Sequence, residues 1–351
     1  MGKPRNLKEI ASSGPVIVFG AGGGGDVISA YHVAKRLREL GGKTIIGALV
    51  WERYIIDPHP GPLPLSTFLG IEPLSQTSAL ADGNAVAYRF GRKIIPHAIH
   101  LARTINEQVL LLDGSLGAEG LRTGLEAAIE YFNASTVIAV DAGGDILGRG
   151  HEEGIWSPLA DAMSLYATKH ASAYPLIAVH SPGSDGEIHF TTLLKYISEI
   201  ATDDGLIAVT GLAKSDVSEL EQLINNVASE ASRIPLQAFK GTYGQVRIRK
   251  GTREVEVTPC NVITYVLDAY TVCSKTRLGE TVAGTWHIAD ASRKLNEELC
   301  LYTEYDLEKD VARQLEQGVS LEDIDAIKLR EAGRARIMSK CKGKRTTGNE
   351  V

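Results

Sequence analysis

The sequence predicts an α/β protein in which a doubly wound, mostly parallel sheet carries helices on both faces. Three observations support this prediction. Short apolar runs without polar alternation recur through the first two thirds of the chain, as expected of strands buried on both faces. Stretches with helical spacing of apolar residues separate these runs. Glycine and aspartate follow several of the runs directly, as they do in loops at the carboxyl ends of parallel strands.

The expected strands and helices alternate along the chain. Strands are predicted at 15–20, 43–50, 107–113 and 136–141, and two more within 174–187 and 205–212. The first helix, 26–40, has the apolar spacing of a single buried face. Further helices are predicted at 120–135 and 157–171. Ser157 is expected to cap the latter helix, with Pro158 at its first position.

The last third of the chain has a different character. Residues 244–257 alternate between polar and apolar side chains and predict an added antiparallel hairpin. Helices are predicted at 261–275 and 288–300, and the chain becomes charge-rich and helical from Asp306. We therefore expect three parts. They are an α/β domain over 1–305, a C-terminal helical extension over 306–340 and a disordered basic tail over 341–351.

Composition excludes several classes of protein. The 351 residues carry a formal net charge of −6, which argues against nucleic acid as a partner. No segment approaches the roughly 18 consecutive apolar residues of a membrane span. Four cysteines lie far apart without a C-x-x-C pair, so neither a disulfide framework nor a zinc site is predicted. A cytoplasmic protein is expected, and self-association into a homo-oligomer is a further expectation.

Bare backbone follows the first predicted strand. Glycine occupies four consecutive positions: Gly22, Gly23, Gly24 and Gly25. With Gly20, these residues satisfy the G-x-G-x-x-G pattern between a strand and a helix. The amides of such a loop, at a helix N-terminus, bind anionic groups such as phosphate.

Two acids near this loop favour different ligands. Glu52, just after the second strand, stands where a ribose-binding acid is expected in a dinucleotide site. Asp26 opens the first helix and places negative charge where a pyrophosphate would need amides. Asp26 is therefore either a cap of its own helix or a partner for hydroxyl groups or a metal ion.

Aspartates follow three of the predicted strands. They are Asp26, Asp113, Asp141 and Asp145. If the strands are neighbours, these carboxylates meet in one crevice, where their repulsion requires a divalent cation, a cationic ligand or hydroxyl groups. Asp141 and Asp145 are the candidate ligands of Mg²⁺ and, with Asp113, the candidate catalytic acids. The alternative is that each aspartate caps its own helix or stabilises its own turn.

The loop after the strand at 136–141 contains other candidates. Gly143 and Gly144 would allow a ligand to approach the backbone closely. Arg149 could bind phosphate or carboxylate, and His151 could exchange protons near neutral pH. The alternative for this segment is a polar surface loop with Trp156 in the core.

Four motifs in order resemble a known family. They are "VFGAGGGGDVISA", "VWERYIIDPHPGP", "VDAGGDILGRGHEEGIWSPLADAMSL" and "AVHSPGSDGE". Together they resemble domain of unknown function 1152, an uncharacterised family with a Rossmann-like core. The resemblance implies a Rossmann-like fold and the importance of these motifs to about residue 300. It supplies no reaction and no established catalytic residues.

Three functional hypotheses remain open at this point. The first is an enzyme or specific binder of a nucleotide, nucleoside or phosphorylated sugar, acting by Mg²⁺-assisted hydrolysis or group transfer. The second is an NAD(P)-dependent oxidoreductase, which the glycine pattern and Glu52 favour and Asp26 disfavours. The third is a non-catalytic metabolite sensor whose helices beyond residue 306 meet a partner.

Overall fold

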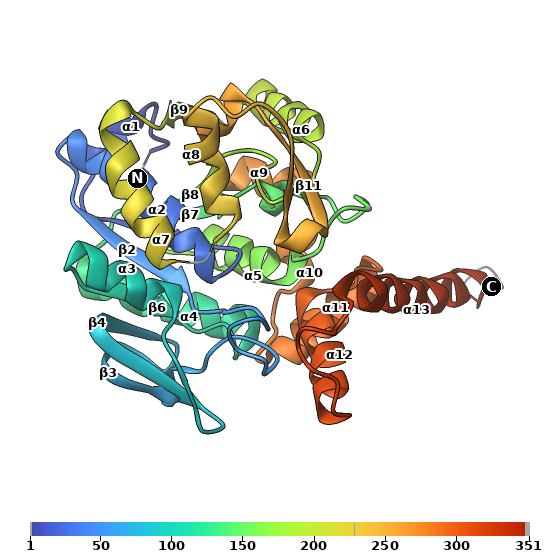
Figure 1. Cartoon of the computed structure of the whole chain (residues 1–351). Helices are drawn as coiled ribbons and strands as arrows, with labels where there is room; N and C mark the ends of the chain where they lie inside the picture. The colour runs from blue at the N-terminus through green and yellow to red at the C-terminus, as the bar shows by residue number, and fades with distance from the viewer. Residues whose placement is uncertain (1, 228, 348–351) are drawn as a thin grey trace.

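The computed structural model, which describes residues 2–227 and 229–347, is built around a large mixed sheet. The strands lie in the order β3-β4-β6-β2-β1-β7-β8-β12-β9, and β5 pairs with β4 (Figure 1). Strands β6, β2, β1, β7 and β8 are parallel neighbours. The sheet therefore confirms the α/β prediction.

The parallel centre reverses its strand order beside β1. These strands are β1 (Val16–Gly20), β2 (Thr44–Leu49), β6 (Val109–Leu112), β7 (Thr136–Ala142) and β8 (Tyr174–His180). From β1 the chain adds β2 and then β6 on one side, and β7 and then β8 on the other. In sheets of this kind, the reversal opens a crevice outside the carboxyl ends of the two central strands. Here that crevice lies between the ends of β1 and β7.

Antiparallel strands extend the parallel centre on both sides. One side carries β3 (Phe68–Pro73), β4 (Ser78–Arg89) and β5 (Arg92–Ile94), and the other carries β12 (Ile263–Asp268) and β9 (Leu206–Gly211). Strand β12 corrects the predicted helix over 261–275, because only Ala269–Lys275 forms an α-helix, α9. A short apolar run has no periodicity that separates a buried strand from a helix. Pairing with β8 and β9 decides the conformation.

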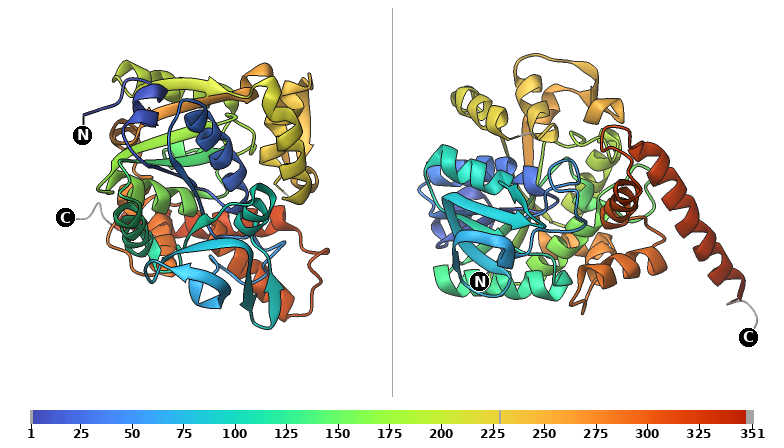
Figure 2. Two further views of the ribbon diagram at one scale, coloured as in Figure 1. Left: turned by 90° about the vertical axis from the view of Figure 1, so that its left-hand side faces the viewer. Right: turned by 60° about the horizontal axis from the view of Figure 1, so that its bottom comes forward.

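Helices cover both faces of the sheet, as Figure 2 shows. The longer ones are α2 (Val27–Glu39), α3 (His97–Ile105), α4 (Gly117–Phe132), α5 (Pro158–Lys169), α6 (Phe190–Thr202) and α7 (Val217–Asn226). The short ones are α1 (Leu7–Ser12), α8 (Ile234–Phe239) and α10 (Leu278–Thr281).

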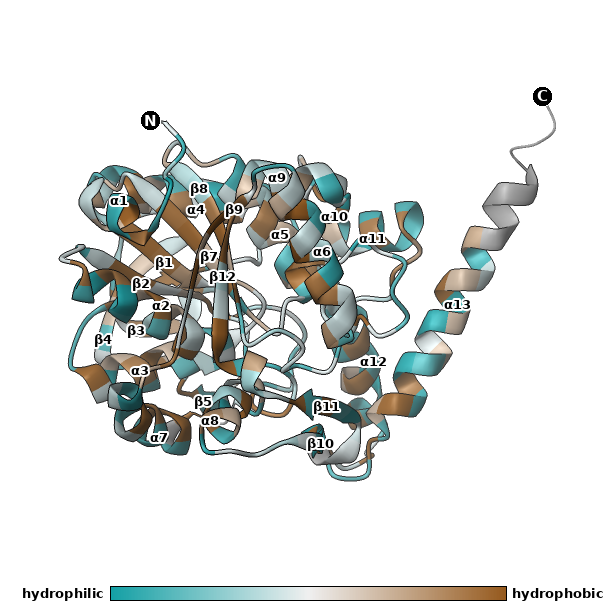
Figure 3. Cartoon of the chain, turned by 90° about the horizontal axis from the view of Figure 1, so that it is seen from above, coloured by the Kyte–Doolittle hydropathy of each residue, from teal (hydrophilic) through white to brown (hydrophobic). Residues whose placement is uncertain are grey.

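Strand β1 shows how the sheet divides the core. Its residues Ile17 and Phe19 belong to one buried cluster, together with residues of α4 and α5. Val16 and Val18 belong to a second buried cluster, with residues of α2 and α3. Successive side chains of a strand point to opposite faces, so two-sided burial requires a continuously apolar strand. Figure 3 shows these central strands as mainly hydrophobic.

The predicted hairpin at 244–257 is confirmed. Strands β10 (Gly244–Ile248) and β11 (Arg253–Val257) pair antiparallel, with Gly244 opposite Val257. Val255 and Val257 pack against Ile234 and Ala238, so helix α8 covers one face of the hairpin. The hairpin sheet is separate from the main sheet.

The C-terminal region consists of three helices, α11 (Ile288–Glu298), α12 (Glu304–Glu316) and α13 (Ala326–Thr347). Helix α12 spans the domain boundary expected at residue 305, and α13 extends away from the rest of the chain (Figures 1 and 2). Helix α13 continues to Thr347, within the stretch 341–351 for which a tail was predicted. Residues 348–351 lie outside the described residues.

Two other features concern predictions from composition. A disulfide joins Cys300 to Cys341, whose Cα atoms are 6.1 Å apart. The cysteine spacing did not predict this bond, because it depends on the turn between α12 and α13, which brings together residues 41 positions apart in sequence. No helix within the described residues is long and apolar enough to cross a membrane.

Candidate functional site

A cavity of about 860 Å³ opens at the carboxyl edge of the central strands. The glycine loop borders it, as do Asp141 at the end of β7 and Asp145 in the short 3-10 helix η3 (Asp145–Leu147). The buried or partly buried acids that also line it are Asp26, Glu52, Asp161, Asp185, Glu187, Glu304 and Glu308, and the exposed acids are Glu230, Glu322 and Asp325. The reversal of strand order therefore coincides with a strongly acidic cavity.

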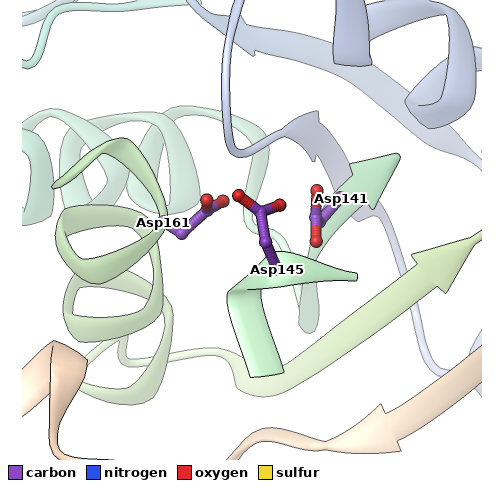
Figure 4. A group of neighbouring side chains, drawn as sticks. All are labelled: Asp141, Asp145 and Asp161. Atoms are coloured by element: carbon purple, nitrogen blue, oxygen red, sulfur yellow. The ribbon is translucent and has the colours of Figure 1, made fainter. Parts of the chain in front are cut away.

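Three of these acids form the candidate metal centre. One carboxylate oxygen from each of Asp141, Asp145 and Asp161 lies within 4.8 Å of the other two, and all three side chains are buried. Figure 4 shows Asp161, from α5, directed toward Asp145, with Asp141 on the other side of Asp145. Within the described part of the chain, no hydrogen bond from a neutral donor offsets the repulsion between Asp161 and the other two acids. Among the described residues, neither of its buried oxygens has a hydrogen-bond partner.

Asp141, Asp145 and Asp161, which we call the triad, would repel one another strongly if all three were ionised without a counter-ion. Burial, together with the neighbouring charges of Asp141 and Asp26, raises the pKa of Asp161 well above its usual range. Burial and the adjacent acids also raise the pKa values of Asp141 and Asp145. Such groups are either protonated or neutralised by a cation. Carboxylate oxygens are the ligands that Mg²⁺ and Mn²⁺ prefer, so the triad has the chemistry of a divalent-cation site.

A second acidic group shares Asp145 but is a poorer ligand set. Asp145, Asp185 and Glu187 also place carboxylate oxygens within 4.8 Å of one another. Glu187, however, already accepts bonds from the N–H groups of Trp156 and Ser157, from the Ser157 hydroxyl and from the Arg253 guanidinium. Burial alone would raise its pKa, but Arg253 and these donors lower the pKa to about 2. Glu187 thus acts as an acceptor that orders the loop before α5.

The glycine loop is only partly free to bind an anion. The N–H of Gly22 donates to Asp26 Oδ2 at 2.8 Å, and the N–H of Gly24 donates to the Trp51 carbonyl at 3.1 Å. The Asp26 side chain makes no capping bond to α2, so its helix-cap alternative is wrong. Asp26 instead faces the cavity, where burial raises its pKa to about 7.

Glu52 is committed to a protein partner. Its carboxylate is buried, forms an ion pair with the His97 ring and accepts the His97 backbone N–H at 2.9 Å. Gly24 is required beside it, because a Cβ atom there would lie 2.3 Å from Glu52 Oε1. Glu52 lines the cavity, but its carboxylate is already bonded to His97. A ribose-binding acid would need a free carboxylate.

Arginines supply positive charge to the same cavity. Arg53 donates to the Gly22 carbonyl, and its buried Nη1 has no hydrogen-bond partner among the described residues. Arg249 also lines the cavity, and no ion pair to its side chain is found in the described part of the chain. Arg253 is bound to Glu187 at 2.7 Å. Arg53 also pairs with Glu304 at 3.7 Å, and Arg233 is a further arginine of the lining. Arg53 and Arg249 are the two cations that we consider for an anionic ligand.

Several predicted site residues lie elsewhere. Asp113 does not line the cavity, since its carboxylate accepts the N–H groups of Ser115 and Leu65 at 2.7 and 3.0 Å. Asp113 was expected to share one crevice with the glycine loop and Asp141. The crevice forms, but Asp113 is not part of it. Gly20 ends β1 and lies against the backbone of Asp26, where a Cβ atom would be 2.7 Å from the carbonyl carbon.

Four further candidates in the loop after β7 also lie outside the cavity lining: Gly143, Gly144, Arg149 and His151. Gly143 and Gly144 have positive φ angles of 125° and 104°, and Gly143 leaves room for Asp185. Arg149 pairs with Glu199 and lies over the ring of Tyr196. His151 is exposed and borders a second cavity of about 540 Å³. Neither Arg149 nor His151 approaches the triad.

Sequence reasoning missed the third member of the triad. Asp161 lies in the first turn of α5, within the "SPLADAMSL" part of a quoted motif. Its signal was the single acid in a helix that is mainly apolar, and the structure shows almost all residues of this helix to be buried. Asp185 and Glu187 similarly stood within "HSPGSDGE".

The start of α5 depends on another residue that sequence reasoning missed. Ser157 does not cap the helix, because its hydroxyl bonds to Glu187. The carboxylate of Glu304, on α12, accepts the N–H groups of Leu159 and Ala160 at 3.0 and 2.8 Å. A residue far along the chain therefore fixes the turn that carries Asp161.

Fold and site together describe an α/β protein with a cluster of acids at the crevice of a parallel sheet. The chain matches the family described as "Protein of unknown function (DUF1152)" over residues 17–312, and it belongs to that family. No curated protein and no solved structure matches the chain.

Proposed function

We propose that the protein is a divalent-cation-dependent enzyme that acts on a phosphorylated small molecule of the nucleotide or sugar-phosphate type. One observation carries the proposal. Asp161 presents a buried carboxylate without a hydrogen-bond partner, among the described residues, to Asp141 and Asp145. A bound Mg²⁺ or Mn²⁺ would supply the missing positive charge and would allow all three acids to ionise.

The groups around the triad favour a phosphate as the remaining ligand. Three carboxylates leave positions on an octahedral cation for water and for substrate oxygens. Arg53 and Arg249 would bind the other phosphate oxygens. The glycines of the loop allow a phosphate to approach the backbone without a side chain in the way, although the amides of Gly22 and Gly24 are engaged.

Hydrolysis or group transfer is the reaction class that suits this arrangement. The cation would polarise a phosphoryl oxygen and orient the attacking water or hydroxyl group. Attack forms the new P–O bond while the bond to the leaving oxygen breaks. Asp26, held by the Gly22 N–H, faces the same cavity and would accept the proton released by the nucleophile. The departing oxygen takes its proton from solvent.

Two alternatives stay as competing hypotheses. A nicotinamide-dependent oxidoreductase has less support, because Glu52 is bonded to His97 and two loop amides are used within the protein. A metabolite sensor would use the same cavity without turnover. We also propose a small-molecule ligand rather than nucleic acid or a membrane as the partner, and a homo-oligomer as the assembly.

A cytoplasmic location also stays a proposal. Disulfides are uncommon in the reducing cytosol, which makes the Cys300–Cys341 bond relevant to this question. Trapping free thiols in intact cells would decide it. Alkylated Cys300 and Cys341 would agree with the cytosol, and a pair protected as the disulfide would argue for an oxidising compartment.

The first experiment measures cation binding by isothermal titration of the full chain with Mn²⁺ and Mg²⁺. Asp161→Asn should weaken Mn²⁺ binding by about 100-fold, since even residues that only support metal ligands cost 10–100-fold. Asp290→Asn, an exposed acid on α11, is the matched control and should leave binding unchanged. Equal affinity of wild type and Asp161→Asn would contradict the metal site.

The second experiment measures turnover. Release of inorganic phosphate from a panel of nucleotides and sugar phosphates should depend on added Mg²⁺ or Mn²⁺ and should be lost in Asp161→Asn. Cation binding without any turnover across the panel would favour the sensor alternative. Reduction of NAD(P)⁺ that is indifferent to chelation would favour the oxidoreductase.

A further inference from the structure

The cavity lining is chemically divided. The triad carboxylates belong to the buried part, where Asp141 and Asp161 are each 1% exposed, whereas the lining acids Glu322 and Asp325 are exposed. Leu307 is buried, and several other apolar side chains are more accessible, with Ile55 60% exposed. These apolar residues are Tyr54, Ile55, Ile56, Leu307, Leu321 and Ile324, and we call them the apolar wall.

The apolar wall comes from two segments that meet at the cavity. Residues 54–56 follow β2 in the chain, and the others belong to α12 and to the turn between α12 and α13. Tyr54, Leu321 and Ile324 pack against one cluster that includes the buried residues Tyr302 and Leu307. The wall therefore adds apolar surface to a cavity that is otherwise rich in acids, with the exposed Glu322 and Asp325 in the same turn as Leu321 and Ile324.

Other aromatic side chains at the cavity are already covered. The Arg53 guanidinium lies 4.6 Å from the ring centre of Trp51. Trp156 has Arg253 and Arg330 over its ring at 4.7 and 4.4 Å. A flat ligand group cannot displace these arginines without breaking their cation–π contacts. It would contact Tyr54 and the aliphatic members of the wall instead.

Part of the wall lies beyond the region that defines the family. The family match ends at residue 312, whereas Leu321 and Ile324 come later. Their turn is held in place by the Cys300–Cys341 disulfide and by Arg330, which donates to the Glu153 and Ile155 carbonyls. Leu321 and Ile324 therefore line the cavity from outside the matched region.

We infer that the substrate carries an aromatic group, of the size of a phenyl ring or nucleobase, next to its phosphate. The inference rests on the proposed function and names the substrate class of the same site. A cavity of about 860 Å³ is much larger than a cation and a phosphate require, and it is within the usual range for a complete small molecule. Burial of the ring against the apolar wall adds affinity that the phosphate alone does not provide.

The test compares two phosphonates that resist hydrolysis, methylphosphonate and phenylphosphonate, by isothermal titration of the full chain with saturating Mn²⁺. Phenylphosphonate should bind about tenfold more tightly, since a partly buried ring contributes about one factor of ten. In the double variant Leu321→Ser, Ile324→Ser, this preference should fall severalfold while the affinity for methylphosphonate stays unchanged.

Two further variants separate the wall from general effects on folding. Ile55→Ser changes a side chain that is 60% exposed, so it should lower the preference without affecting stability. Ile327→Ser is the matched control, because Ile327 is 38% exposed on α13 and does not line the cavity. Ile327→Ser should keep the wild-type preference.

The outcomes distinguish the inference from the function on which it rests. Equal affinity of wild type for the two phosphonates, or a preference that survives both wall variants, would overturn the inference and leave the phosphate site intact. Binding of Mn²⁺ without binding of either phosphonate would overturn the phosphate part of the proposed function, and the inference with it.

Discussion

Gly22 lies against the carboxylate of Asp161: a Cβ atom at Gly22 would be 3.0 Å from Asp161 Oδ1. The same atom would lie 2.9 Å from Asp26 Oδ2. At Gly22 the loop after β1 thus contacts helix α5, which carries Asp161. Its lack of a side chain is needed for the approach of two carboxylates, in addition to any approach of a ligand.

Gly22→Ala should therefore disturb the metal site more than the fold. The new methyl group would push Asp161 away from Asp141 and Asp145, and Mn²⁺ affinity should fall about tenfold. Isothermal titration measures the affinity, and a thermal melt reports the fold. Gly279→Ala, whose Cβ would also meet a neighbour at 3.2 Å, is the control away from the cavity. Unchanged Mn²⁺ affinity in Gly22→Ala would refute this account of the contact.

Asp161→Asn should change how stability depends on pH. Burial and the neighbouring acids raise the pKa of Asp161 in the folded protein, whereas an unfolded aspartate titrates near 3.9. Between these two pKa values the folded state binds more protons, so the free energy of unfolding falls as the pH rises. The asparagine side chain of the variant does not titrate, so the contribution of this position to the slope is lost.

Metal-free urea unfolding should show the effect. The stability of Asp161→Asn relative to wild type should increase as the pH rises from about 4 toward neutrality. At the same Mn²⁺ concentration, wild type should be stabilised at neutral pH by more than the variant, because the variant binds the cation more weakly. Parallel stability curves in chelator would show that Asp161 has an ordinary pKa.

Glu304→Ala should weaken both the fold and the metal site. Removal of its carboxylate leaves the N–H groups of Leu159 and Ala160 without their acceptor at the start of α5. Loss of a helix cap and of buried acceptors should cost about 1–3 kcal/mol of unfolding free energy. Because Asp161 is the next residue, Mn²⁺ affinity should also fall. Glu316→Ala, an exposed change at the other end of α12, should have neither effect.

The Cys300–Cys341 disulfide should stabilise the C-terminal helices. It closes a loop across a sequence separation of 41, which restricts the unfolded chain. Cys300→Ser should lower the free energy of unfolding of the oxidised protein by about 2–4 kcal/mol. The difference should vanish when both proteins are unfolded in excess dithiothreitol. A wild type whose stability is the same with and without reductant would contradict a stabilising role.

The strands of the parallel centre were predictable because their pattern is local, whereas β3, β4 and β5 were not predicted. A strand buried on both faces must be apolar throughout, and β1, β2, β6, β7 and β8 carry that pattern in the sequence. Strand β12 was not predictable, since its six residues suit a strand or a helix until β8 and β9 provide hydrogen-bond partners.

The candidate site was predictable in part for the same reason. Residues that directly follow parallel strands share one edge of the sheet, and this placed Gly23, Asp141 and Asp145 at the cavity. Asp113 follows β6 in the same way, yet its carboxylate bonds to Leu65 and Ser115. No local pattern distinguishes an aspartate that stabilises a turn from one that faces a cavity.

The sequence by itself determined the α/β class, the position of the glycine loop and two of the three clustered acids, because strand burial and strand-end loops are properties of short segments. Only the tertiary structure decided that Asp161 joins them, that Glu304 caps the helix carrying it and that the turn before α13 walls the cavity. Those choices depend on contacts between residues far apart in the chain, which packing of the whole molecule selects.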